Sequence, residues 1–277
     1  DAARRFDWLG TATLSTALVL LLIALDQVDT WGWGDPRVIG ALAVAGVLFA
    51  AVVPIERRRG PWALVPDDVA ANATFRAAAI AVLLMSMTFF TALMYLPQFM
   101  EKLLGWSALA AGAGLLPMMV SFGLSSFAAG PLYEQWGGKR VVVAGAACLP
   151  LGTLLLSRLE ADSSYGVLVP GMVVLGVGIG LFYSAITTTA VSALAPSRAS
   201  LAGGIVYMFQ TAGGALGLGI ATTIVSTTAG REAEAGGTAG QAFTDGVQAT
   251  LRVTAAIAAA GLLVAALFLD RRAGADD

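Results

Sequence analysis

The side chains in this sequence that could do chemistry are hydroxyl and amide groups at helical spacing inside long apolar segments. Thr88, Thr91, Tyr95 and Gln98 follow one another at intervals of 3, 4 and 3 residues, which puts them on one face of a helix. The further candidates of this kind are Ser121, Tyr183, Thr187, Tyr207 and Gln210. In an apolar span such groups avoid lipid, so they either line a cavity that binds a molecule or hydrogen-bond between helices.

The composition provides few of the residue types that catalysis and metal binding require. The 277 residues include no histidine and one cysteine, which excludes a Ser-His-Asp triad, a histidine-ligated metal and an internal disulfide within this chain. The net charge is −2 without a basic stripe, so nucleic acid is not expected as a partner. We therefore expect no enzyme, no metal and no cofactor.

The elements that position these side chains are membrane-spanning helices. Hydrophobic residues make up 57% of the chain and charged residues 12%, whereas soluble domains carry about 45–50% and about 25%. Uncharged stretches of at least 17 residues occupy 8–25, 38–55, 77–100, 103–133, 141–157, 163–197, 199–230 and 253–269. Each is long enough for one span and lacks the alternation of barrel strands. The predicted fold is an all-α, multi-pass membrane protein with eight transmembrane helices.

The distribution of Lys and Arg predicts the orientation, because cytoplasmic loops are enriched in both. With eight spans both ends lie on one side. That side carries Arg4, Arg5, Arg57, Arg58, Arg59, Arg76, Lys139, Arg140, Arg198, Arg271 and Arg272, while the other has Arg37, Lys102, Arg158, Arg231 and Arg252. Both termini are therefore expected in the cytoplasm and the protein in the inner (plasma) membrane.

The spacing of the spans divides the chain into three parts. Residues 1–55 are expected to form a hairpin of two helices, near 9–28 and 38–55, and residues 56–74 a cytoplasmic linker. Residues 75–277 are expected to form a bundle of six helices. Within the bundle, the Gly/Ala/Thr-rich segment 232–246 is expected to be a flexible outer loop.

Glycines inside two of the spans recur at intervals of four residues. Gly176 with Gly180, and Gly213 with Gly217, form small-xxx-small pairs that allow helices to pack closely in lipid. We expect them at helix contacts and not at a nucleotide site.

Several motifs resemble one family of transporters along nearly the whole chain. The segments 96–98 (LPQ), 105–112 (GWSALAAG) and 115–117 (LLP) resemble the ninth and tenth spans of fourteen-span drug:proton antiporters of the EmrB/QacA type, in the major facilitator superfamily. Segments 6–10 (FDWLG) and 31–33 (WGW) resemble that family's seventh span and the loop after it, and 209–217 (FQTAGGALG) its thirteenth span. The resemblance implies spans seven to fourteen: a linking hairpin and the C-terminal six-helix half, with the N-terminal half missing.

A degraded form of the superfamily's loop signature lies between the fourth and fifth predicted helices. Gly130, Leu132, Gly137 and Lys139 match the pattern Gly-x-Leu-Ala-Asp-Arg-x-Gly-Arg-Lys, with Glu134 in place of the aspartate. Gln135 and Gly138 replace two of its arginines, and Arg140 follows. The resemblance implies that this turn holds helix ends in one of two access states. An ordinary positively charged cytoplasmic turn is the alternative.

The resemblance also implies that the four helices with polar faces line a central cavity and that the helices at 141–157 and 253–269 are peripheral. Gln98 and Gln210 are then expected to converge on a substrate. Met85, Met87, Phe89, Phe90 and Met94 would offer an adaptable apolar surface, although packing is their commoner role.

The expected function is that of a proton-driven exporter of many drugs or lipophilic compounds, working by alternating access. Its partners would be the lipid bilayer, a small-molecule substrate, protons and the missing half. No carboxylate or lysine lies at mid-span, so this chain is not expected to supply the proton-coupling group. A narrow-specificity metabolite exporter of the same fold and a non-transporting membrane subunit are the alternatives.

Overall fold

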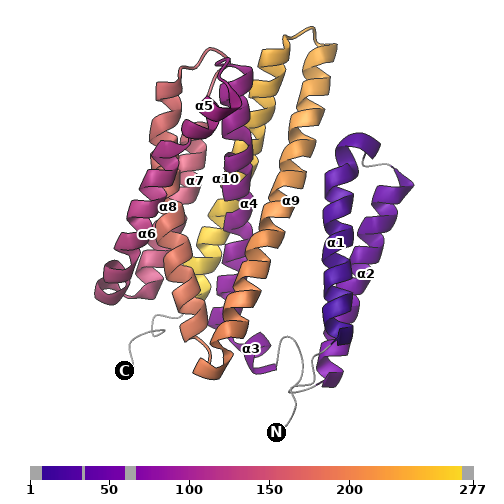
Figure 1. The fold of residues 1–277 in the computed structure, drawn as a ribbon, viewed down its shortest axis with the longest axis vertical. Helices are drawn as coiled ribbons and strands as arrows, with labels where there is room; N and C mark the ends of the chain where they lie inside the picture. Colours follow the sequence, from indigo (N-terminus) through magenta and orange to yellow (C-terminus); the bar gives the residue numbers. More distant parts are fainter. Residues whose placement is uncertain (1–7, 33–34, 60–66, 270–277) are drawn as a thin grey trace. The chain divides into compact units, whose positions relative to one another are not determined.

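A computed structural model describes residues 8–32, 35–59 and 67–269, and every regular element in these ranges is a helix. The chain divides into two compact units, residues 1–73 and 74–277 (Figure 1). The all-helical fold class is therefore confirmed for the described residues.

The first unit is built on two helices packed against each other, α1 (Trp8–Trp31) and α2 (Pro36–Arg59), followed by the short α3 (Asp67–Ala71). Asp35 begins α2: its carboxylate accepts a hydrogen bond from the backbone N–H of Arg37 at 2.7 Å. α2 continues four residues beyond the predicted end at residue 55, because charged side chains end an apolar segment without ending a helix.

The second unit is a bundle of helices. They are α4 (Ala73–Lys102), α5 (Ala108–Ala113), α6 (Leu116–Trp136), α7 (Gly138–Leu156), α8 (Tyr165–Ser192), a 3-10 turn η2 (Pro196–Arg198), α9 (Ala199–Glu234) and α10 (Ala239–Phe268). In this bundle α8 packs against both α6 and α7, and α10 packs against α7 and α9. Among the described residues, six segments are long and apolar enough to cross a membrane: α4, α5 with α6, α7, α8, α9 and α10. These spans agree with the six helices predicted for the bundle.

Close packing in the bundle depends on glycines of α8. A Cβ at Gly176 would overlap Ser121 and the Met118 carbonyl of α6, and a Cβ at Gly180 would overlap Ser125 and the Phe122 carbonyl. Helix contact of this kind requires small residues, since lipid supplies no hydrophobic force between helices. The prediction for this glycine pair is confirmed.

The predicted outer loop at 232–246 is wrong, because most of that segment is helical. α9 runs to Glu234 and α10 begins at Ala239, so only residues 235–238 connect them. Thr238 caps α10: its Oγ1 accepts from the Gln241 backbone N–H at 3.3 Å, while the Gln241 side chain accepts from the Thr238 N–H at 3.1 Å. This capping box stabilises the start of a helix inside a Gly-rich sequence. Composition alone did not predict that helix start.

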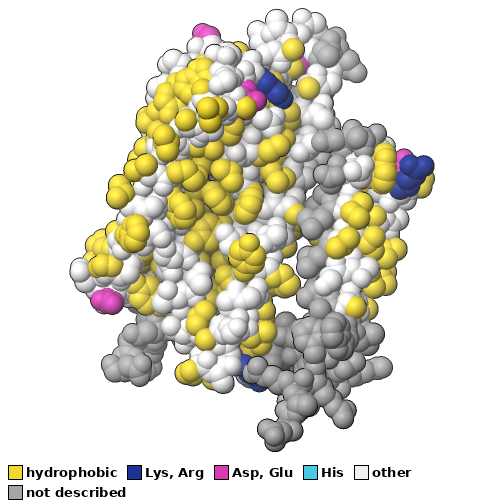
Figure 2. Space-filling view, in the orientation of Figure 1, with side chains coloured by type: hydrophobic (Ala, Val, Ile, Leu, Met, Phe, Trp, Pro, Cys, Tyr) yellow, Lys and Arg dark blue, Asp and Glu magenta, His cyan; other side chains and the backbone are white. Residues whose placement is uncertain are grey.

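The surface of the second unit fits a lipid environment. Figure 2 shows a face of this unit on which hydrophobic side chains dominate along the helices, while the Lys, Arg, Asp and Glu side chains in view lie toward the ends. Large apolar side chains are exposed on several helices, including Leu124, Phe127, Leu151 and Leu263. Such a surface would be a liability in water and is normal for a membrane-embedded bundle.

Candidate functional site

An aromatic cluster with one hydroxyl pair forms where α4 meets α8. The Ser86 and Tyr183 hydroxyls are 2.7 Å apart, and Ser86 also lies 2.7 Å from the Val82 carbonyl, to which it donates. With Ser86 donating to Val82, the Tyr183 hydroxyl must donate to Ser86. One polar contact is thus built into an otherwise apolar helix contact.

Two phenylalanines lie next to Tyr183, and a third packs against one of them. The ring of Phe89 lies 6.2 Å from that of Tyr183 and 5.2 Å from that of Phe90, while Phe182 and Tyr183 meet edge to face at 5.3 Å. Phe182 is fully buried, whereas Phe89, Phe90 and Tyr183 are half-buried. We call this group the aromatic cluster; its members are Ser86, Phe89, Phe90, Phe182 and Tyr183. One of its rings is buried and three are partly exposed.

Helix α9 closes one side of this cluster through glycines. A Cβ at Gly214 would come 2.8 Å from the Phe90 ring, and Cβ atoms at Gly213 and Gly217 would overlap the α4 backbone at Leu83 and Met87. The close packing predicted for Gly213 and Gly217 is confirmed. Because these contacts advance in the same direction along both helices, α4 and α9 run parallel.

Two of the predicted cavity residues on α4 lie inside helix contacts. Thr88 is fully buried and donates to the Thr254 carbonyl of α10 at 2.8 Å, so it joins α4 to a helix expected to be peripheral. Thr91 is also fully buried, and its Oγ1 has no hydrogen-bond partner among the described residues. Thr88 therefore matches the interhelical alternative.

The outer part of the same face holds Tyr95 and Gln98. Tyr95 is nearly buried, donates to Thr222 of α9 at 3.4 Å, and packs 6.5 Å from the Phe243 ring of α10. Gln98 is half-buried and accepts a hydrogen bond from Lys102, whose ammonium also lies 4.3 Å above the Phe243 ring.

The expected convergence of Gln98 and Gln210 is wrong. Tyr95 and Thr222 are hydrogen-bonded and so lie at the same depth in the bundle. Gln98 is three residues beyond Tyr95, whereas Gln210 is twelve residues before Thr222 on a parallel helix. At about 1.5 Å of rise per residue the two amides are about 20 Å apart along the helix axes. Face spacing predicted the side of each helix but carried no information on relative depth.

The remaining predicted cavity residues differ in exposure. Ser121 bonds back to the Pro117 carbonyl at 2.7 Å and packs against Gly176, so it belongs to the α6–α8 contact. Thr187 is exposed, Tyr207 is 70% exposed and Gln210 is half-buried. The latter three lie on parts of α8 and α9 that the described helices leave open.

A second polar group, which the sequence did not reveal, joins α6 to α8. Ser126 and Ser184 are 2.7 Å apart, and Thr189 lies 3.2 Å from the Tyr133 hydroxyl. Ser126, Tyr133 and Ser184, with Glu134, line a groove of about 280 Å³. Single hydroxyls 58 and 56 residues apart form no local pattern, so only the packing of the two helices could have identified them.

The loop signature proves to be a one-residue turn between two helices. Gly137 is the only residue between α6 and α7, and its φ is +81°. Glycine adopts this left-handed conformation without strain. Gly138 is buried, and a Cβ there would come 2.6 Å from the Tyr133 ring. A side chain at position 138 would therefore require the Tyr133 ring to move.

The other signature residues surround that turn. Lys139 donates to the Leu269 carbonyl at 2.8 Å and thereby ties the start of α7 to the end of α10. Leu132 is half-buried, whereas Gly130, Glu134 and Arg140 are exposed. The structure shows a link between helix ends, while a role in switching between access states stays a prediction.

Within the described ranges, no group of three or more His, Cys, Asp or Glu side chains could hold a metal ion. The rings and hydroxyls of the aromatic cluster suit reversible binding of an apolar or aromatic molecule.

Comparison with known proteins points to one family. The family model described as Major Facilitator Superfamily matches residues 8–218 and, in a second match, residues 78–276. The chain is 29% identical over 99% of its length to the puromycin resistance protein pur8 of Streptomyces alboniger, of which it covers 56%. It is 30% identical over 86% of its length to the cephamycin export protein CmcT of Amycolatopsis lactamdurans, covering 50%, and 26% identical over 81% to the multidrug transporter protein MdtP of Bacillus subtilis, covering 42%. The chain thus spans about half the length of the curated relatives it matches.

Proposed function

The chain belongs to the major facilitator superfamily, a family of transporters and not of enzymes, and we propose that it forms the C-terminal part of an exporter of drug-like compounds. Relatives named for resistance to or export of puromycin, cephamycin and tetracenomycin C support this proposal. The protein is accordingly a multi-pass membrane protein with six candidate spans among its described residues.

The single observation that carries the proposal is the aromatic cluster. It lies on the contact of α4 and α8, has half-buried rings at its edge, and contains one hydroxyl pair that orients without adding charge. Partly exposed aromatic rings suit a site that accepts several apolar substrates. Multidrug export is therefore favoured over a narrow-specificity exporter or a non-transporting subunit.

The wider architecture is part of the same proposal. α1 and α2 would span the membrane as a linking hairpin, which gives eight transmembrane helices with residues 56–74 as a cytoplasmic linker and both termini in the cytoplasm of an inner-membrane protein. An N-terminal six-helix half would face the open parts of α8 and α9 and complete the substrate cavity. Alternating access needs such a second bundle, because two bundles rock around a site at their interface.

Proton coupling would depend on groups outside this bundle. The described carboxylates of the second unit, such as Glu101, Glu160 and Asp245, lie near helix ends and are nearly all exposed. A proton carrier must be reachable from both sides of the membrane, so an acid in the other half is the better candidate.

The test replaces Tyr183 in the full-length protein. Tyr183→Ala should change which of several dyes or antibiotics are exported, by about tenfold for the most affected compound, because it removes a ring that borders the cluster. Tyr183→Phe keeps the ring and removes only the bond to Ser86, so we expect a change of several-fold or less, in line with about 0.5–1.5 kcal/mol.

The matched control is Leu263→Ala on α10, where the side chain is 59% exposed on the apolar surface. It should leave the relative export of all compounds unchanged. If Tyr183→Ala lowers protein abundance while every ratio of export rates stays the same, the cluster is structural and the proposal is wrong.

A further inference from the structure

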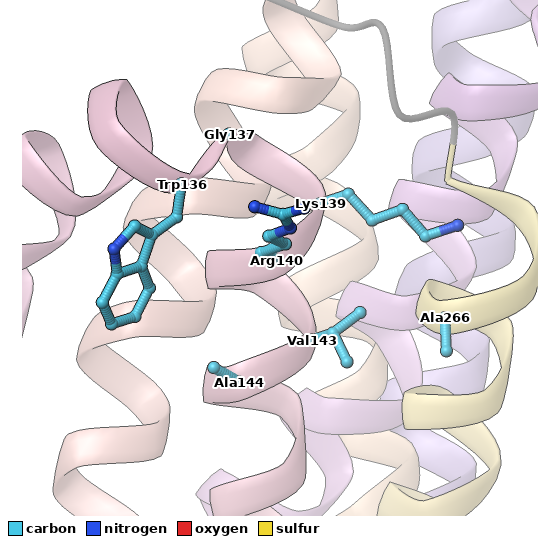
Figure 3. Close-up of a pocket in the computed structure, with 7 residues that line it drawn as sticks. All are labelled: Trp136, Gly137, Lys139, Arg140, Val143, Ala144 and Ala266. Atoms are coloured by element: carbon cyan, nitrogen blue, oxygen red, sulfur yellow. The ribbon is translucent and has the colours of Figure 1, made fainter.

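A basic pocket lies at the end of the bundle where α6 gives way to α7. Its volume is about 680 Å³, and it is lined by Trp136, Gly137, Lys139, Arg140, Val143, Ala144 and Ala266. Figure 3 shows Arg140 between Trp136 and Lys139, with Lys139 extending toward the last turns of α10. The pocket is distinct from the aromatic cluster, with which it shares no residue.

The cations of this pocket are available to a ligand. Arg140 is exposed, and its guanidinium has no hydrogen bond or ion pair to any side chain that the structure describes. Lys139 uses one donor for the Leu269 carbonyl, which leaves two of its three N–H groups. α7 also begins here without a side-chain cap, so the positive end of its dipole adds to the two charges.

The rest of the lining is apolar and continues onto the lipid-facing surface. Val143, Ala144 and Ala266 form the wall below the cations, and on the same two helices Leu151 and Leu267 are 53% and 69% exposed. Trp136 is 51% exposed at the rim. Tryptophan favours the level of lipid headgroups at a membrane surface. An anion that bound here would have hydrocarbon beside it.

We propose that this pocket binds an anionic phospholipid, with the headgroup phosphate at Arg140 and Lys139 and an acyl chain along the apolar wall of α7 and α10. Basic pockets between spans recognise anionic headgroups because charge and hydrogen bonds act together at the edge of the hydrocarbon layer. The lipid would hold the α6–α7 turn against the end of α10. The inference rests on the membrane location of the bundle and not on the proposed export activity.

The experiment measures lipid binding to the intact, delipidated protein by native mass spectrometry. Phosphatidylglycerol should bind about tenfold more tightly than phosphatidylcholine of the same chain length. Arg140→Gln, which keeps the Lys139 bond to Leu269, should remove most of this preference, and Lys139→Gln/Arg140→Gln should remove it entirely. The control Arg158→Gln/Arg252→Gln removes two exposed charges outside the pocket and should keep the preference.

Three results would overturn the proposal. The first is equal binding of the two lipids by the unmodified protein. The second is an equal loss of preference in the control variant, which would indicate unspecific attraction to charge. The third is full competition by inorganic phosphate at millimolar concentration and constant ionic strength, which would show a free-anion site that gains nothing from the acyl chains.

Discussion

Helix α8 has two unlike sides, and their difference separates what holds this bundle together from what could bind a substrate. Toward α6 its tightest contacts are made by Gly176 and Gly180, where an added atom would meet backbone or a serine hydroxyl. The Ser126–Ser184 and Tyr133–Thr189 hydroxyl contacts lie further along the same side. Toward α4 the contacts are made by Tyr183, whose ring lies 6.2 Å from that of Phe89 and whose hydroxyl lies 2.7 Å from that of Ser86. The packing on the glycine side can change only if a helix moves, whereas the shape of the aromatic side can change by rotation of side chains.

The comparison also explains why polar residues within spans have different roles. Thr88 and Ser121 are satisfied by carbonyl oxygens and belong to helix contacts. Tyr207 and Gln210 point to no such partner among the described residues and lie on a helix of which only about a quarter of the candidate span is buried. Residues of the second kind are the better candidates for contact with a substrate or with a second bundle.

The largest effect is expected on the glycine side. Gly180→Val would place atoms on Ser125 and on the α6 backbone, and α8 could accommodate them only by moving away. Overpacking in a tight core costs about 1–3 kcal/mol, and contact with backbone puts this variant at the upper end of that range. We expect a large loss of folded protein, measured by detergent size-exclusion profile and thermal inactivation.

Gly123→Val on α6 is the matched control, because nothing lies within 4 Å of a Cβ at that position. Should both variants fold equally well, the α6–α8 contact is not as tight as the geometry indicates, and the contrast between the two sides of α8 fails.

An intermediate effect, on selectivity and not on stability, is expected at Gln210. Gln210→Ala removes a half-buried amide with no described side-chain hydrogen bond, so thermal stability should remain near that of the unmodified protein. In the full-length protein, export of at least one compound should change several-fold, because a lost hydrogen bond to a ligand is worth about 0.5–1.5 kcal/mol. Export assays over a panel of dyes measure it. If the variant is less abundant but exports all compounds in unchanged proportions, Gln210 has a structural role.

The smallest effect compares two buried threonines one helical turn apart. Thr88→Val removes the bond to the Thr254 carbonyl, and hydrogen bonds between spans average about 0.6 kcal/mol. Thr91→Val removes a hydroxyl without a described partner and should be neutral or slightly stabilising. Thermal unfolding of the two variants distinguishes them, and a more severe loss for Thr91→Val would reveal a partner for its hydroxyl outside the described residues.

Membership of a membrane transporter family and the positions of the six spans in the second unit could be predicted from the sequence. Apolar length sets a span wherever it lies in a fold, so segments such as 77–100 and 163–197 correspond to α4 and α8. The glycine pairs were also readable, because close approach of helices in lipid requires small residues at fixed spacing. Helix ends beyond the apolar segments were less predictable, as the capping box at Thr238 shows.

What only the tertiary structure decided is which polar residue meets which neighbour. Spacing of 3 and 4 put Thr88, Thr91, Tyr95 and Gln98 on one face, yet Thr88 faces α10, Tyr95 reaches α9, and Gln98 lies about 20 Å in depth from Gln210. Ser86 with Tyr183 and Ser126 with Ser184 are paired across 97 and 58 residues of sequence. Hydropathy records whether a side chain can sit in a span. The partner of that side chain depends on the rotation and axial shift of two helices against each other. These are set by the packing of the whole bundle.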